Sequence, residues 1–292
     1  MAAAPPFDDT SLDDTQVNRA APPGSMRYFA LLYTPPELRD ALTALFVIDA
    51  EIRESAQSAN HDVAHTRLQW WRTEIDRLVN ATPQHPATKL VNSDDAAHRQ
   101  EFARLHELVA AADMDLARMT YANASELKAY ASRSGGAIAE LIAVRLNAEA
   151  RGAKADAPAL ALANRLGLAI RLTEIVRDAR ADAHGGRLYI PLDALDSHGA
   201  KLEDFVAKEY GAAVKAALRA VSEIAMQEFA AVMTEISRSG RAYLRPLVVL
   251  GALHRQLLRR IAKQDFNVAN ERIELGPIEK PWVAWRAARK LS

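Results

Sequence analysis

Residues 166–191 read LGLAIRLTEIVRDARADAHGGRLYIP and give the clearest indication of the fold. Up to Ala183, apolar residues recur at steps of three and four, which is the period of an α-helix. Gly185-Gly186 ends that helix, and Pro191 closes a short extended segment behind it. We therefore expect a long helix followed by a polar loop.

One face of this helix carries a charged stripe. Residues three or four apart share a helix face, so one line holds Arg171, Glu174, Asp178 and Asp182. Three carboxylates on successive turns repel one another and need a positive partner. Their spacing suits Mg²⁺, which binds one or two carboxylates and fills its other positions with water and phosphate oxygens. A solvated face neutralised by neighbouring arginines is the alternative that spacing alone favours, whereas Arg187 in the loop favours phosphate binding.

The helical period continues over most of the chain. It covers residues 38–52, 63–78, 97–120, 125–147, 157–183, 201–237 and 243–265, and no alternation runs long enough to predict a sheet. Residues 1–24 are rich in Pro and Asp with few large apolar residues, which predicts a disordered leader. No Gly-, Ser- or Pro-rich linker divides the remainder. We expect a single all-α domain over residues 25–292.

The composition argues against several classes of function. Lys and Arg number 37 against 37 Asp and Glu, so a general electrostatic grip on nucleic acid is not expected. The absence of cysteine excludes disulfides, thiolate metal sites and cysteine nucleophiles. No uninterrupted apolar run of about 18 residues predicts a membrane-spanning helix. We expect a cytoplasmic protein, with peripheral contact at the inner membrane as the alternative.

Several motifs resemble those of the squalene/phytoene synthase family and occur in the family's order. They are Ser25-Met-Arg-Tyr-Phe29 with Pro35-Pro-Glu-Leu-Arg39, Arg67-Leu-Gln-Trp-Trp-Arg72 with Gln84-His-Pro86, Asp113-Met-Asp115, Tyr130-Ala-Ser-Arg-Ser-Gly-Gly136, segment 166–191, and Arg272-Ile-Glu-Leu-Gly-Pro277 with Lys280. Segment 166–191 is the strongest match, because it resembles the family's second aspartate-rich motif and its Gly-Arg-x-Tyr-x-Pro loop. The resemblance implies an all-α isoprenoid-synthase fold around a central cavity.

The resemblance also implies roles for individual residues. Enzymes of this family join two prenyl diphosphates head to head in isoprenoid biosynthesis, and two facing aspartate-rich motifs hold Mg²⁺ on the diphosphate. By resemblance, Asp178 and Asp182 are metal ligands and, together with Tyr189, catalytic residues. The residues expected to bind the substrate diphosphate are Ser25, Arg53, Arg171, Arg177 and Arg187, and further metal candidates are Glu174 and Asp49.

The first aspartate-rich motif of the family is missing here. Arg53 and Gln57 stand where the family has its two facing aspartates, and Arg171 and Glu174 stand where it has Gln and Asn. A guanidinium at position 53 repels a metal cluster, since both are positively charged.

Two compensations stay open. In one, Asp49 and Glu51 supply the missing carboxylates, although residues two apart point to different helix faces. In the other, Arg53 and Arg171 replace the metal, either by pairing with Asp178 and Glu174 or by binding diphosphate directly.

Two functions from different classes therefore stay open. A branch of the family that includes mitochondrial complex I assembly factors also lacks the first motif, and its pattern is similar to Asp49-Ala-Glu-Ile52. The first function is a prenyltransferase that binds or condenses prenyl diphosphates, with Mg²⁺ as its cofactor if active. The second is a non-catalytic binding or respiratory-complex assembly protein with a protein partner. Fold and reaction are separate conclusions.

Overall fold

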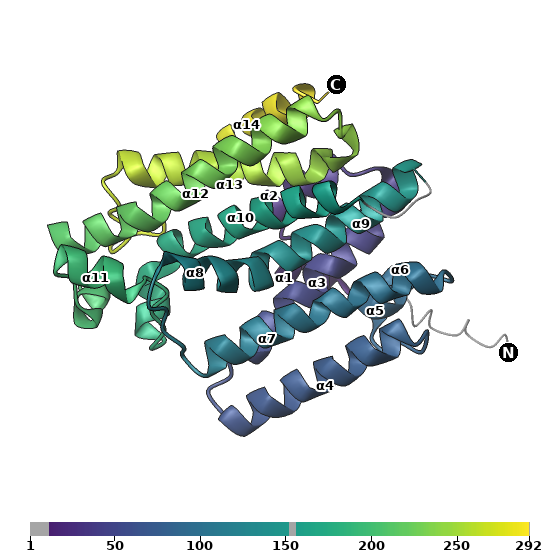
Figure 1. The fold of residues 1–292 in the computed structure, drawn as a ribbon, viewed down its shortest axis with the longest axis horizontal. Helices are drawn as coiled ribbons and strands as arrows, with labels where there is room; N and C mark the ends of the chain where they lie inside the picture. The colour runs from purple at the N-terminus through teal and green to yellow at the C-terminus, as the bar shows by residue number, and fades with distance from the viewer. Residues whose placement is uncertain (1–11, 152–155, 292) are drawn as a thin grey trace, which may run out of the picture.

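The computed structural model describes residues 12–151 and 156–291, which form helices and no strand (Figure 1). The α-helices are α1 (Asp14–Ala20), α2 (Met26–Leu32), α3 (Arg39–Ser55), α4 (His61–Val79), α5 (Pro86–Val91), α6 (Ala96–Glu101), α7 (Leu105–Leu116), α8 (Ala124–Ala131), α9 (Ala137–Arg151), α10 (Ala157–His184), α11 (Leu192–His198), α12 (Ala212–Arg238), α13 (Arg245–Lys263) and α14 (Glu279–Arg289). Shorter turns are η1 (Pro36–Leu38), η2 (Phe102–Arg104), the π turn η3 (Ser132–Gly136), η4 (Leu202–Val206) and η5 (Ala242–Leu244). The all-α prediction is confirmed.

Helix α10 is the central element. It begins where the Asp156 carboxylate accepts a hydrogen bond from the backbone N–H of Ala159 at 2.7 Å, with a proline in the first turn. It ends at Gly185, and Gly186 then turns the chain with φ of 74°. Helices α9, α12 and α13 and turn η3 pack around it, so apolar side chains are buried on most of its circumference. This burial holds the charged stripe of α10 in a fixed position.

The other helices are arranged in layers on the two sides of α10 (Figure 1). Helices α12, α13 and α14 cover one side, and α3 and α9 lie on the other, followed by α7 and α4 at the lower edge of the view. Buried apolar residues from Ala20 to Ala288 form one continuous cluster. The helices that will carry the site, α3 and α10, therefore belong to the same core.

Residues 12–24 depart from the predicted disordered leader. They include α1, whose Ala20 is buried against the core and whose Arg19 pairs with Glu54 of α3 at 2.7 Å. The prediction of disorder was wrong for this part because a short helix can pack through alanine and polar contacts without large apolar residues. Residues 1–11 lie outside the described residues.

One helix prediction needs correction, and one helix was not predicted. The predicted helix over 201–237 begins only at Ala212, because the preceding residues form turn η4 and a loop that ends at Gly211. Beyond residue 265 the sequence pattern predicted no helix, yet α14 lies there. The pattern missed α14 because the side chains it buries are alanines rather than large apolar residues.

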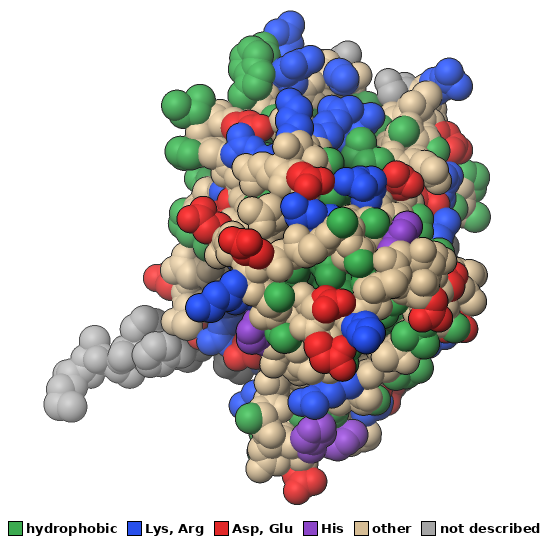
Figure 2. Space-filling view, turned by 90° about the vertical axis from the view of Figure 1, so that its left-hand side faces the viewer, with side chains coloured by type: hydrophobic (Ala, Val, Ile, Leu, Met, Phe, Trp, Pro, Cys, Tyr) green, Lys and Arg blue, Asp and Glu red, His purple; other side chains and the backbone are tan. Residues whose placement is uncertain are grey.

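The surface carries charged side chains of both signs. Figure 2 shows them across one face of the molecule, with Lys and Arg gathered toward its upper end. Within the part of the chain that the structure describes, each helix is too short or too polar to traverse a lipid bilayer.

Candidate functional site

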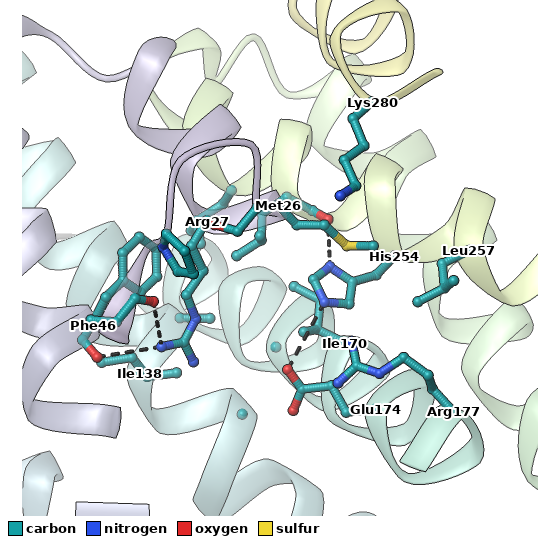
Figure 3. A pocket seen from close by; sticks show the side chains of 18 of the residues that line it. Met26, Arg27, Phe46, Ile138, Ile170, Glu174, Arg177, His254, Leu257 and Lys280 are labelled. Carbon is teal, nitrogen blue, oxygen red and sulfur yellow. Dashed lines mark hydrogen bonds and ion pairs between the residues drawn. The ribbon is translucent and has the colours of Figure 1, made fainter. Parts of the chain in front are cut away.

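A cavity of about 380 Å³ lies among α2, α3, α9, α10 and α13 (Figure 3). Its apolar lining includes Phe46, Ile138, Ile142, Ile170, Leu247 and Leu250. Its cationic lining comprises Arg27, Arg53, Arg177, Arg272 and Lys280. Against these five cations stand two carboxylates, Glu174 and Glu274, so the lining has an excess of positive charge. A cavity of this kind fits an amphiphilic anion.

Arg53 is held between two carboxylates from different helices. Its Nε donates to Oδ1 of Asp49 at 2.8 Å, and its Nη1 lies 3.4 Å from Oε2 of Glu174 on α10. Asp49 is fully buried and also pairs with Arg27 of α2. Burial by itself would raise the pKa of Asp49. Arg53 and Arg27 lower it by more, so the pKa of this carboxyl lies below its usual value. The chain thus carries an ion-pair bridge between α3 and α10.

Glu174 is the centre of this bridge. Arg171, one turn before it, places Nη1 3.4 Å from the same Oε2 that Arg53 approaches. Burial by itself would raise the pKa of Glu174. The opposite effect of Arg53 and Arg171 is larger, so the pKa lies well below its ordinary value. His254 of α13 lies beside it, with Nε2 3.9 Å from Oε1, and Figure 3 shows the two facing each other. Burial lowers the pKa of His254 to about 4, so its imidazole is neutral at pH 7.

Arg171 extends the network into a buried aromatic cluster. Its Nη2 donates to the Tyr130 hydroxyl at 2.7 Å, and its guanidinium lies 5.1 Å from the centre of the Tyr189 ring. Both tyrosine hydroxyls donate to Oδ1 of Asp115 at 2.8 Å. Burial raises the pKa of Tyr130 to about 12. Tyr189 is 5% exposed and does not line the central cavity. It contacts the network through Arg171.

Asp178 and Asp182 lie in a second hollow beside the central cavity. This hollow is lined by both aspartates, Arg187, Gln57 and the segment around Arg272. Asp178 is already paired, because Arg177 donates to its Oδ1 at 2.9 Å and Arg272 donates to the same atom at 3.0 Å. Arg177 and Arg272 also line the central cavity and so connect the two spaces.

The backbones of α10 and turn η3 meet at two glycines that line the cavity. A Cβ added to Gly167 would lie 2.8 Å from Cβ of Ala139 and within 3 Å of the Gly135 carbonyl. A Cβ added to Gly135 would in turn meet the Gly167 carbonyl and lie 2.8 Å from Cβ of Arg171. Only glycine permits this approach, which places Arg171 against the tyrosine cluster.

Comparison with known proteins identifies the family. The model of the squalene/phytoene synthase family matches residues 21–279. The chain belongs to this family. It is 26% identical over 280 residues to a presqualene diphosphate synthase of Sinorhizobium fredii, covering 94% of this chain and 96% of that protein. It is 24% identical over 258 residues to chloroplastic phytoene synthase 1 of Arabidopsis thaliana, where the match covers 87% of this chain but 60% of that protein.

Solved structures have the same fold. A dehydrosqualene synthase superimposes with a TM-score of 0.78 at 14% identity, over 95% of both chains. A squalene synthase, HpnC from Alicyclobacillus acidocaldarius, superimposes with a TM-score of 0.73 at 17% identity, over 87% of this chain and 93% of that one. The predicted isoprenoid-synthase fold is therefore confirmed.

The expected squalene/phytoene synthase metal cluster does not fit the residues present. The resemblance implies carboxylates on α3 that face those on α10, but α3 offers Arg53 at this place, and the Asp49 carboxylate pairs with two arginines. Glu51, a second acid on this part of α3, pairs with other residues: its Oε2 lies 3.2 Å from Nε2 of His85, and its Oε1 accepts a hydrogen bond from Gln16 at 2.9 Å. Among the described residues, no three His, Asp or Glu side chains form a group that could hold a metal ion.

The predicted site residues divide into two sets. The structure brings Arg53, Arg171 and Glu174 together, as the arginine-replacement hypothesis requires. The same hypothesis was wrong in pairing them with Asp178, which contacts Arg177 and Arg272 instead.

Other predicted residues lie farther from this network. Ser25 lines the cavity, but its hydroxyl accepts the backbone N–H of Tyr28 at 3.1 Å and so caps α2. Arg187 lies in the second hollow with Asp182. Sequence reasoning missed Arg27 and His254. Arg27 belongs to the Ser25–Phe29 motif and could have been found there, whereas His254 has no motif around it.

Asp182 should make stability depend on pH. Burial raises its pKa from 3.8 to about 6, so the folded state keeps a proton that the unfolded state has lost, and stability falls as pH rises through this interval. We expect Asp182→Asn to raise the free energy of unfolding by about 1–3 kcal/mol at pH 8 and by less at pH 5. Urea unfolding at both pH values measures this. Asp196→Asn on the exposed face of α11 is the control, and an equal gain at both pH values would contradict the assignment.

Proposed function

We propose that this chain binds a prenyl diphosphate in the central cavity and acts on it as a prenyltransferase of the squalene/phytoene synthase type. The observation that supports this best is the combination of apolar walls and excess positive charge in one cavity of the family fold. The names of the similar proteins, a presqualene diphosphate synthase and phytoene synthases, support the same class of reaction.

The cations at the cavity supply the proposed recognition of the diphosphate. Lys280 reaches toward the cavity from α14 (Figure 3), and no ion pair engages it among the described residues. Arg177 and Arg272 lie where the cavity meets the second hollow, each within reach of Asp178. Guanidinium groups bind phosphate oxygens through two parallel hydrogen bonds, and an ammonium adds a point charge. These groups hold the diphosphate while the prenyl chain lies against the apolar wall.

In the proposed reaction the chain's own cations take over part of the role of a metal. Departure of diphosphate leaves negative charge on its oxygens, and fixed cations stabilise that charge as it develops. Apolar side chains such as Ile142 and Ile170 exclude water from the carbocation that remains. Mg²⁺, if it takes part, would be bound through Asp178 and Asp182 of α10 alone, together with phosphate oxygens.

Binding and turnover should be measured separately to test the function. Calorimetry with farnesyl or geranylgeranyl diphosphate, with Mg²⁺ and with a chelator, should show binding under both conditions because the arginines do not depend on metal. Product analysis after incubation with Mg²⁺ tests condensation. Absence of both binding and product with either diphosphate would refute the proposal. Binding without product would favour a non-catalytic family member, for which the Arg53–Glu174 bridge is the relevant observation.

Lys280→Gln is expected to weaken farnesyl diphosphate binding about tenfold or more. A charged hydrogen bond contributes roughly 1.5–3 kcal/mol. The substitution removes a cation that forms no ion pair with the residues the structure describes, so its charge is available to the diphosphate. Lys290→Gln, an exposed lysine outside the cavity lining, is the matched control and should bind as the unaltered protein does. Equal affinity of the two variants would place the diphosphate elsewhere.

A further inference from the structure

On helix α14 the small side chains point toward the core and the large apolar side chains point toward solvent. Its buried residues are Ala284, Ala287 and Ala288, which pack toward α13. By contrast, Trp282 is 55% exposed, Trp285 is 40% exposed, and the preceding Ile278 is 83% exposed. A helix that only completes the core shows the opposite arrangement, because burial of large apolar side chains stabilises most.

The two tryptophans form a single exposed aromatic surface. Their ring centres are 5.0 Å apart, and the two rings are stacked with an interplanar angle of 27°. Arg289 lies over the Trp285 ring at 4.8 Å and keeps its charge at the surface. Contiguous exposed apolar groups bordered by polar residues mark an interaction surface.

Within residues 278–290, which carry this aromatic surface, cations outnumber acids. Residues 278–290 contain Lys280, Arg286, Arg289 and Lys290, of which the last three are exposed. The only acid among them, Glu279, is bound to Arg260 at 2.5 Å. The upper end of Figure 2, where α14 lies in Figure 1, shows Lys and Arg gathered around exposed apolar side chains.

We propose that the exposed face of α14 docks on the surface of an anionic lipid bilayer. Tryptophan is enriched at the interface between headgroups and hydrocarbon, because its ring is amphipathic. Helices that lie in this interface carry Trp on one face with Lys and Arg beside it, as α14 does. The cations complement lipid phosphates, whereas a protein partner would need an acidic patch to match them.

The position of α14 beside the cavity agrees with this orientation. Lys280 of α14 lines the cavity, and α2, which carries the lining residue Met26, packs against α14. A bilayer that contacts α14 would therefore lie beside the cavity that we propose for the prenyl chain. This last step alone rests on the proposed function.

Vesicle binding of the full chain tests the docking surface without any prenyl compound, so its result is separate from that of the proposed function. Phosphatidylcholine vesicles with and without phosphatidylglycerol are sedimented with the protein at low and high salt. We expect binding to the anionic vesicles, weakened by salt.

Trp282→Ser with Trp285→Ser should reduce the vesicle association constant about tenfold or more. Arg286→Gln with Arg289→Gln should reduce it about fivefold per charge removed.

Trp70→Ser is the matched control. Trp70 is also 40% exposed but lies on α4, at the edge of the molecule opposite α14 (Figure 1), so this variant should bind vesicles normally. Circular dichroism of each variant checks that the helices are retained. The proposal is overturned if the protein ignores anionic vesicles, or if the double tryptophan variant binds as well as the control. It is also overturned if size exclusion shows a dimer that the same variant dissociates without vesicle binding, because a second copy would then cover α14.

Discussion

Replacing Gly167 with alanine is expected to lower the free energy of unfolding by about 3 kcal/mol or more. The added methyl group would meet the backbone of Gly135 and Cβ of Ala139, and neither can move as a flexible side-chain end would. The two elements must separate, which removes packing around the central helix α10. Urea unfolding followed by circular dichroism measures the loss.

The substitution should also affect the cavity, since Gly135 and Gly167 both line it. We expect weaker binding of farnesyl diphosphate even under conditions where the variant is folded. Gly276→Ala is the matched control, because an added Cβ there meets nothing within 4 Å, and its stability should change by less than about 0.5 kcal/mol. Similar stability of the two variants would show that the approach of α10 to η3 is not a tight constraint.

This glycine pair shows what the sequence could and could not predict. The helical period and the ordered motifs predicted the all-α fold, and the same motifs contained Gly135 and Gly167. Nothing in either motif indicates that the two glycines touch, since 31 intervening residues separate them along the chain. Periodicity reports which face of a helix is buried, but not which other helix buries it.

The charged stripe was predicted from spacing, whereas its contact with Arg53 was predicted only as one alternative that followed from the resemblance. Spacing alone placed Arg171 and Glu174 on one face of a helix. Arg53 lies 121 residues before Glu174, and only the packing of α3 against the same core brings them together. Helices α1 and α14 were missed for a related reason. Both pack through alanines, which carry too weak an apolar signal for a periodic pattern.

Arg53→Met is expected to cost about 3–5 kcal/mol of stability. The substitution preserves much of the side-chain volume but removes the cation that joins Asp49 to Glu174. Glu174 then keeps Arg171 at 3.4 Å, and Asp49 keeps Arg27, yet the partly buried Glu174 and the fully buried Asp49 have each lost one guanidinium partner. Removing one partner of a buried ion pair costs more than removing both, because the remaining charge is left with less compensation. Urea unfolding at pH 7 gives the value.

A double-mutant cycle with Glu174→Gln tests whether the bridge between α3 and α10 is the cause. If Arg53 acts through Glu174, the double variant Arg53→Met/Glu174→Gln should be more stable than the sum of the single losses predicts, by about 1–3 kcal/mol. Arg77→Met is the control, since Arg77 contacts the buried Glu74 at 3.3 Å on α4, away from the cavity, and should show no coupling to Glu174→Gln. Additive losses in the Arg53 cycle would mean that the guanidinium is held by Asp49 alone. Arg53 would then be free of α10, and arginine would not take the place of metal between the two helices.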